Sequence, residues 1–452
     1  MHFELKNKEF YKKSFYTMIP IVLQQLITIG VNFADNLMVG NFGEIQISAA
    51  AFSNQFYSFF QFVCMGLGSG AVVMSSQFWG RHDIKSLKVV VTIAMRFSLI
   101  IGSVFSIAAT LIPSVVLLCF TDDAVVVQAG IPYLQILAVT FLLSGLSSTA
   151  TYLLRSVGEI YIPLLGSLGA FFLNIFFNWM FIFGKLGAPR LELAGAAIGT
   201  VIARTFECCF VFGYFIIRDR KISFRFMDIR CSVKVLFGQY VYYSIPVLIS
   251  DTLLGLSLSL TTVILGHVGR EISSATSIVN SIVQLTNVLN MGMAGAAAII
   301  IGHSIGEGNI PRAVREGNSY VLLSFLLGIA AIFPLLLLEK TYIGFYNVTD
   351  ETRVIAHEML VFTSYILPIQ TVAYVTSKGI LRGGGDTRFL LMADSSFVWL
   401  VSLPLGALAA FVWRLNPILI YIFLRLEYPL KGMVCFVRFC SGKWISEIKK
   451  EI

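Results

Sequence analysis

Twelve apolar runs follow one another along this chain, and each is long enough to cross about 30 Å of hydrocarbon as a helix. The runs lie near residues 14–39, 47–77, 89–112, 129–154, 161–183, 194–217, 237–266, 273–303, 317–338, 354–381, 389–412 and 416–439. Of the 452 residues, 57% are hydrophobic and 13% are charged, whereas soluble domains carry about 25% charged residues. The sequence therefore predicts an all-α polytopic membrane protein.

Basic residues between the runs predict the orientation of the chain. One set of loops, together with both termini, holds most of the Lys and Arg residues and includes Arg155, Lys378 and Arg382. The opposite loops hold only Lys185, Arg190, Arg270, Lys340, Arg353 and Arg414. Because Lys- and Arg-rich loops stay inside, we expect a multi-pass protein of the cell membrane with cytoplasmic termini. The net charge of +8 reflects this orientation and does not indicate a nucleic acid partner.

The second half of the chain repeats landmarks of the first half. Three residues around the first run recur 226 positions later, as the pairs Pro20 and Pro246, Gly40 and Gly266, and Gly43 and Gly269. The segment SSQFWGRHDIKSLK resembles IGHSIGEGNIPRAV at the same spacing, and YLLRSVGEIYIP resembles GILRGGGDTRFL one position further on. Three motifs in nearly one register indicate an internal duplication.

The duplication predicts two six-helix lobes, residues 1–225 and 226–452, joined by the basic loop after the sixth run. Because six spans return the chain to its starting side, both lobes begin on the same side of the membrane. A pseudo-twofold axis along the membrane normal should then relate them, with a cavity between the lobes.

Asp35 is the leading candidate for a functional residue. It lies in the stretch from Ile19 to Gly43, which contains no basic residue. Burying a charge in a bilayer costs on the order of 2.5 to 3.5 kcal/mol, so Asp35 should face a cavity or a partner. Such a carboxylate could exchange a proton or bind a cation, or it could be a buried group satisfied by neighbouring hydroxyls and amides.

Three neutral polar residues of the same half are further candidates. Asn174 and Asn178 stand four residues apart and so share one helix face, and Thr200 lies in the next run. Their oxygens could coordinate Na⁺ or hydrogen-bond a carboxylate. Each of them, taken alone, could equally form an interhelical hydrogen bond.

In the second half, Asp251 and Asp394 are candidates for substrate binding or a second ion site, or for packing carboxylates that neighbours satisfy. Same-face ion pairs are predicted for Arg204 with Glu207, three residues apart, and for Glu427 with Lys431, four apart. Neither a metal-binding histidine motif nor a nucleophile, base and orienting group appears in the sequence. We therefore expect a protein that is not an enzyme and needs no cofactor besides a coupling ion.

These residues resemble the multidrug and toxic compound extrusion (MATE) family over nearly the whole chain. The resemblance rests on Pro20, Asp35, Gly40 and Gly43 and on the segments SQFWGRHD, LLRSVGEIYIPLLGSLGAFFLNIFFNWMFIFG and ILRGGGDTRF. It implies two bundles that open alternately around a central cavity. It also implies export of small organic, often cationic, compounds driven by inward H⁺ or Na⁺, by a chain that we expect to be a monomer among membrane lipids.

The resemblance implies that Asp35, Asn174, Asn178 and Thr200 form the ion site of the first lobe. This chain departs from the family at Asn178, where some members carry a second Asp. Proton coupling through Asp35 and weaker cation binding therefore both stay open. Where other members use a Glu in the seventh span, this chain is apolar, and Asp251 lies about one turn earlier.

A flippase for lipid-linked sugars is the alternative reading. Such a protein would need an Arg-rich cavity for the pyrophosphate group. Intramembrane Arg residues are few in this chain, and Arg204 has Glu207 nearby. Cationic cargo is therefore the favoured expectation.

Overall fold

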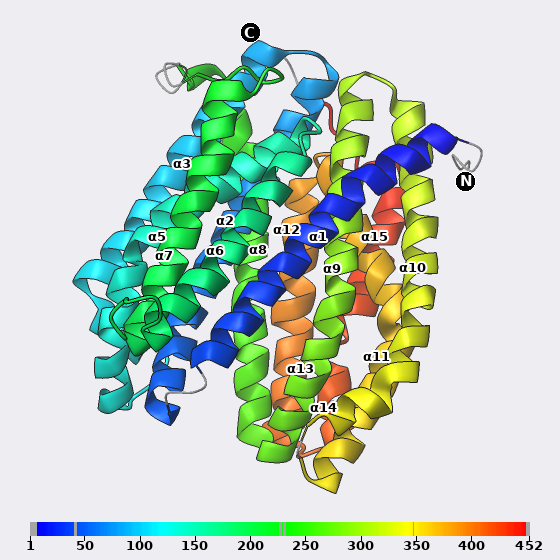
Figure 1. Cartoon of the computed structure of the whole chain (residues 1–452). Coiled ribbons are helices and arrows are strands. Elements are labelled where there is room, and N and C mark those ends of the chain that lie inside the picture. Colours follow the sequence, from blue (N-terminus) through cyan, green and yellow to red (C-terminus); the bar gives the residue numbers. More distant parts are fainter. Residues whose placement is uncertain (1–6, 40–42, 226–227, 229–231, 347, 449–452) are drawn as a thin grey trace. The chain divides into compact units, whose positions relative to one another are not determined.

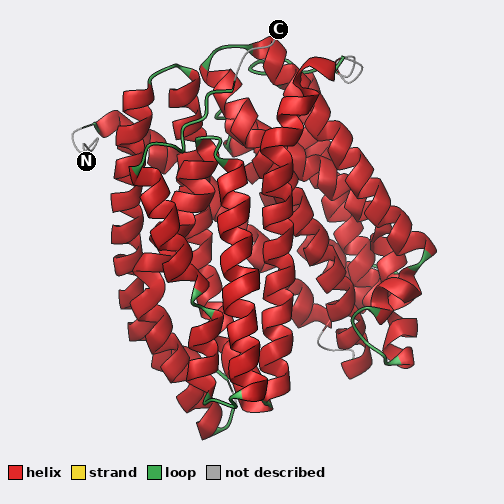
Figure 2. Cartoon of the chain, turned by 180° about the vertical axis from the view of Figure 1, so that it is seen from behind, coloured by secondary structure: helices red, strands yellow, loops and turns green. Residues whose placement is uncertain are grey.

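The computed structural model describes residues 7–39, 43–225, 228, 232–346 and 348–448, and most of these residues are helical (Figures 1 and 2). Gly40 of the repeat and residue 226, the first of the predicted second lobe, lie outside the described residues. Within the described part, β-structure is limited to one isolated bridge between Gly385 and Ile445. The predicted all-helical class is confirmed.

Seven α-helices precede the central loop in the described part of the chain. They are α1 (Lys8–Val39), α2 (Glu44–Gly80), α3 (Ile84–Leu111), α4 (Pro113–Leu118), α5 (Ala124–Ser156), α6 (Tyr161–Phe183) and α7 (Glu192–Gly213). A π-helical segment, η1 (Tyr214–Arg218), extends α7.

The helices after the central loop include three further π-helical segments. The order is α8 (Lys234–Val268), α9 (Arg270–Gly306), α10 (Ile310–Gly344), α11 (Asp350–Tyr374), η3 (Val375–Leu381), α12 (Thr387–Ser396), η4 (Phe397–Ser402), α13 (Leu403–Ala407), η5 (Leu408–Val412), α14 (Pro417–Leu424) and α15 (Glu427–Cys440). Wide π turns insert an extra residue into a helix and are often found at functional sites.

Eleven helical stretches of the described chain are long and apolar enough to cross a membrane. They correspond to the first eleven predicted runs. The twelfth run, near 416–439, is interrupted between α14 and α15, where Arg425 and Leu426 form a turn. Each of these two helices is therefore too short to span a bilayer alone.

By internal contacts, the chain divides into two compact units. Unit 1 contains Met1–Val22, Ser76–Arg81 and Ile245–Lys450, and unit 2 contains Leu23–Ser75 and His82–Ser244. Each unit has apolar clusters of its own, such as that around Met359 and Tyr421 in unit 1 and that around Phe60 and Phe141 in unit 2. The predicted lobe boundary at 225 and 226 stays a prediction.

Equivalent residues of the two repeats adopt the same local structure. Asp83 caps the start of α3 through a hydrogen bond from the Ser86 amide, and Asn309, 226 residues later, caps α10 through the Arg312 amide. Gly158 and Gly385, within the third repeated motif, both have positive φ angles, 76° and 88°. Such angles suit glycine because it has no Cβ, which explains why both repeats keep it there.

In unit 1, the last turns of α2 and α9 cross at close range through repeat-equivalent glycines. A Cβ on Gly80 would collide with the His303 carbonyl oxygen, and a Cβ on Gly306 would collide with the Gln77 carbonyl oxygen. Both helices also end at these glycines. The crossing therefore depends on two positions without side chains.

The chain after α15 packs against this end of unit 1, and we call residues 441–448 the C-terminal strap. Trp444 is 1% exposed and packs on Gly384. The Ser446 amide donates to the Gly384 carbonyl at 2.8 Å, and the Gln77 side chain bonds both Ser446 and Ile448. Arg81 donates to the Ile448 carbonyl. The strap thus ties the end of α2 to the turn after η3.

In unit 2, the central loop is held by Asp228. Lys88 Nζ and the Arg225 amide each donate to Asp228 Oδ2 at 2.9 Å. Burial alone would raise the pKa of Asp228, but these hydrogen bonds and the nearby positive charges hold it below its usual value.

Candidate ion site in unit 2

Three helices of unit 2 bring the four first-half candidates together. Asp35 comes from α1, Asn174 and Asn178 from one face of α6, and Thr200 from α7. Asn178 Nδ2 donates to Asp35 Oδ1 at 2.5 Å and lies 3.3 Å from Asn174 Oδ1. Asn174 Nδ2 lies 3.4 Å from Thr200 Oγ1. The four side chains therefore form one connected polar group.

The group is buried on the α6 side and partly open at Asp35. Asn174 and Asn178 are 2% and 0% exposed, whereas Asp35 and Thr200 are only partly buried. Asp35 has a neutral amide rather than a base as its hydrogen-bond partner. Among the described residues, no cationic side chain forms a hydrogen bond with its carboxylate.

Close packing of α6 on α7 positions the Asn178 amide. A Cβ on Gly199 would collide with Asn178 Oδ1, and a Cβ on Gly195 would meet the backbone of Phe181 at 2.7 Å. Small residues let membrane helices approach closely. Glycine at 199 therefore leaves the space that the amide occupies.

The residues of this group fit a monovalent cation or a proton. Asn178 Oδ1 is buried and has no hydrogen-bond partner among the described residues. This acceptor could receive a hydrogen bond from a protonated Asp35 or contribute an oxygen to Na⁺, beside the oxygens of Asp35, Asn174 and Thr200. No group of three or more His, Cys, Asp or Glu side chains in the described chain could hold a metal ion.

A second polar chain lies in the same unit. Arg204 Nη1 donates to Glu207 Oε2 at 2.7 Å, which confirms the predicted ion pair. Ser167 Oγ donates to Glu207 Oε1 at 2.8 Å, and Gln24 Nε2 donates to Ser167 at 2.8 Å. Arg155, which the orientation argument placed in a loop, is buried in α5 and donates to Gln24.

Asp251 and Asp394 lie in unit 1 and are neutralised by buried cations. Lys378 Nζ bonds Asp251 Oδ1 at 2.8 Å and Asp394 Oδ2 at 2.6 Å. Arg382 Nη2 bonds Asp251 Oδ1 at 2.8 Å, and Lys431 Nζ lies 3.1 Å from Asp394 Oδ1. Lys431 thus forms an ion pair with Asp394, whereas the sequence predicted an ion pair between Lys431 and Glu427.

Sequence reasoning missed the bridging role of Lys378. It assigned Lys378 and Arg382 to a cytoplasmic loop, but both are buried, at 6% and 7% exposure, and Lys378 lies within η3. The signal that could have found Arg382 is its spacing from Arg155. Arg382 lies 227 positions after Arg155, which has the same place in the first repeat.

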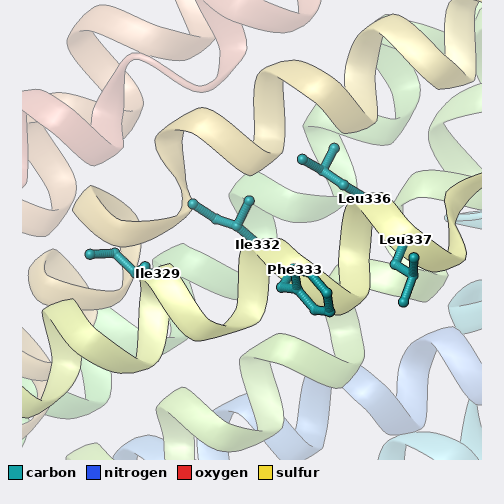
Figure 3. A pocket seen from close by; sticks show the side chains of 5 residues that line it. All are labelled: Ile329, Ile332, Phe333, Leu336 and Leu337. Carbon is teal, nitrogen blue, oxygen red and sulfur yellow. The ribbon is translucent and has the colours of Figure 1, made fainter.

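A groove elsewhere in unit 1 has no polar chemistry. It has a volume of about 540 Å³ and is lined by Ile329, Ile332, Phe333, Leu336 and Leu337, all on α10 (Figure 3). Phe333 and Leu337 are 72% and 65% exposed. Such a surface suits contact with lipid tails.

The family model MatE matches residues 20–180 and matches again at residues 246–408. The chain belongs to the MATE family. Members of the MATE family are multidrug efflux transporters rather than enzymes. The two matches begin 226 residues apart, which is the spacing of the repeated landmarks and confirms the duplication.

The chain is similar to several MATE relatives over most of its length. It is 22% identical to the probable multidrug resistance protein YoeA of Bacillus subtilis, over 86% of this chain and 84% of that protein. It is 26% identical to the probable multidrug resistance protein NorM of Rhizobium meliloti, over 89% of each. A crystal structure of a mutant of the Vibrio cholerae MATE transporter VcmN has a TM-score of 0.86 at 15% identity and covers 96% of this chain and 97% of that chain. The MATE fold of twelve helices is therefore confirmed.

Proposed function

We propose that this MATE protein exports small organic, often cationic, compounds by alternating access and that a monovalent cation bound at Asp35 drives the export. The observation that carries this proposal is the connected group of Asp35, Asn178, Asn174 and Thr200, in which one partly exposed carboxylate faces neutral oxygens and amides. The names of relatives such as the probable multidrug resistance protein NorM support the class of cargo.

The composition of the group favours H⁺ over tightly bound Na⁺. It contains one carboxylate, and a single proton neutralises that carboxylate completely. The buried Asn178 Oδ1 would then accept a hydrogen bond from the acid. Na⁺ would need several oxygens to replace its water, and three of the four residues offer only neutral ones.

Whether the membrane potential contributes to this exchange depends on its stoichiometry. One inward charge gains about 2.3 kcal/mol per 100 mV, which corresponds to roughly fortyfold in concentration at about 1.4 kcal/mol per tenfold. Exchange of one monovalent cation for another cancels this electrical contribution. The concentration gradient of the coupling ion then drives export alone.

The proposal includes the sequence-based topology. We place the chain in the cell membrane as a monomer, with both termini cytoplasmic and with lobes at 1–225 and 226–452. Asp251 and Asp394 have a structural role in it, because both already bond Lys378.

Transport by the purified chain in proteoliposomes tests the role of Asp35. A pH gradient and a Na⁺ gradient are imposed separately while a fluorescent organic cation is followed. The Asp35→Asn variant should lose at least tenfold of gradient-driven accumulation. Accumulation equal to that of the unmodified chain would show that Asp35 does not couple the ion.

A further inference from the structure

We infer that a basic surface at the end of α7 binds the headgroups of anionic phospholipids. This surface, which we call the basic patch, lies next to Ile217, belongs to unit 2 and consists of Lys85, Arg218, Arg220 and Arg225. In the proposed topology this end of unit 2 faces the cytoplasm. The inference concerns a lipid partner and does not depend on ion coupling at Asp35.

Helix length puts the end of α7 at the depth of lipid headgroups. The stretch from Glu192 to Arg218 has 27 residues and is long and apolar enough to cross a membrane. At 1.5 Å per residue it is about 40 Å long, which exceeds the hydrocarbon core of about 30 Å. Exposed apolar side chains line it from Phe206 and Phe210 to Ile217, which is 76% exposed. Arg218 follows directly, so the cations begin where the apolar surface ends.

The turn after η1 buries its acid and exposes its arginines. Asp219 is 1% exposed and accepts hydrogen bonds from the backbone amides of residues 221–223 at 2.9 to 3.1 Å. Phe224 is buried, and its ring stacks on Phe215 with the ring centroids 5.5 Å apart. The arginines on either side of Asp219 are both exposed. This packing fixes the turn and leaves two guanidinium groups accessible.

Arg225 adds a third guanidinium group beside these two. Its Nη1 donates to the Ile216 carbonyl at 2.6 Å, at the end of η1. Its backbone amide donates to Asp228, which also accepts a hydrogen bond from Lys88. Lys85 is exposed and lies about one helical turn before Lys88 on α3. The basic patch therefore combines residues from α3 and from the turn after η1.

The acids near the basic patch are bonded elsewhere. Glu159 pairs with Lys221 at 2.9 Å, and Asp228 pairs with Lys88 at 2.9 Å. Among the described residues, no member of the basic patch forms a salt bridge. Over residues 218–234, six basic residues stand against two acidic ones. This excess is unchanged when the nearby charged residues of other elements are counted, namely Asp83, Lys85, Lys88 and Glu159.

The opposite end of unit 2 has the reverse charge balance. Its basic residues Lys185 and Arg190 are exposed, and Arg190 lies 3.6 Å from Glu192. The acids exposed at that end are Glu44, Asp122, Asp123 and Glu192. The excess of positive charge therefore belongs to the end that holds the basic patch.

A phospholipid with a negative headgroup matches these features. Arg guanidinium groups bind phosphate oxygens through paired hydrogen bonds, and clusters of basic residues directly after a membrane span attract anionic lipids. The exposed Ile217 side chain beside the arginines would contact the acyl chains of such a lipid. Because a free phosphate ion has no apolar part, the position of the patch at the end of an apolar surface favours a lipid.

The test measures which lipid lies beside α7. Cys209 is free and exposed, and it lies nine residues, or about 14 Å, before Arg218. It is kept as the only cysteine and labelled with a fluorophore, and the chain is reconstituted in phosphatidylcholine bilayers. A small share of either phosphatidylglycerol or phosphatidylcholine carries a nitroxide on an acyl chain. Quenching of the fluorophore reports how strongly each lipid collects at this site.

Two double variants are compared with the unmodified chain. Arg218→Gln with Arg220→Gln removes two charges of the basic patch. The matched control, Lys185→Gln with Arg190→Gln, removes two charges at the opposite end of unit 2.

For the unmodified chain and the control, we expect phosphatidylglycerol to be enriched roughly fivefold over phosphatidylcholine, since each basic residue at the surface attracts anionic lipid. In the patch variant the enrichment should fall below about twofold for the same reason. High salt should lower the enrichment in the unmodified chain because it screens the charges. Thermal unfolding confirms that each variant is folded.

Several results would overturn the inference. It fails if the unmodified chain shows no enrichment, if the patch variant keeps it, or if the control loses it to the same extent. Loss of enrichment when inorganic phosphate is added at constant ionic strength would show that the patch binds a soluble phosphate instead of a lipid. Transport by Asp35→Asn is a separate measurement, so failure of the proposed coupling would leave this result unaffected.

Discussion

At the scale of single residues, the space beside Asn178 is set by Gly199. A methyl group at this position would collide with the Asn178 amide oxygen. We expect Gly199→Ala to move the amide away from Asp35 and to lower gradient-driven transport at least tenfold, with a loss of stability of about 1 to 3 kcal/mol from overpacking. Transport in proteoliposomes and thermal unfolding measure the two effects.

The matched control for this prediction is Gly213→Ala at the end of the same helix. A Cβ at Gly213 would meet nothing within 4 Å. This variant should transport and unfold like the unmodified chain. Equal behaviour of the two alanine variants would contradict the packing argument.

The four-residue group could be predicted because its chemistry is visible in the sequence. A carboxylate in an apolar run is costly, and two Asn residues four apart must share a face. The role of Gly199 could not be predicted, since it depends on how closely α6 and α7 approach. The contacts of Lys378 could not be predicted either. Its partner Asp251 lies 127 residues away in the sequence, and the wide turn of η3 changes the helical register.

At the scale of secondary structure elements, the C-terminal strap stabilises unit 1. Trp444 is buried against Gly384 and belongs to the apolar cluster that includes Phe439. We expect Trp444→Ala to destabilise the protein by about 3 to 5 kcal/mol, as for other large-to-alanine changes in cores. Thermal unfolding of the purified chain measures this loss.

Lys443→Ala provides the control, because the neighbouring Lys443 is exposed. Its unfolding temperature should stay close to that of the unmodified chain. A Trp444→Ala chain that unfolds at the same temperature as Lys443→Ala would show that the strap adds no stability.

Hydrophobic run length predicted eleven of the long helical stretches, since each run alone determines whether it can span a bilayer. Run length could not predict the strap, which is short and mixed in composition. It also could not predict the break at Arg425 and Leu426, because run length alone does not register the charged residues Arg425 and Glu427 within the twelfth run.

At the scale of the whole molecule, two native cysteines can test the predicted orientation. Cys119 and Cys440 are free and exposed, and they follow the third and twelfth predicted runs. In single-cysteine variants on intact cells, a membrane-impermeant maleimide should label Cys119. Cys440 should react only after the membrane is permeabilised.

A cysteine-free chain gives the background for this labelling. Reaction of Cys440 from outside would reverse the proposed topology. The result does not depend on transport, so it separates the orientation of the chain from its activity.

The duplication could be predicted at this scale because glycines and prolines mark the same turns in both halves. The contacts of these glycines could be identified only from the structure. Gly80 and Gly306 each face a main-chain oxygen of the opposite helix end, and main-chain atoms are identical in every residue. Over evolutionary time the neighbouring side chains could therefore drift in identity without loosening the crossing, as long as neither position acquires a β-carbon.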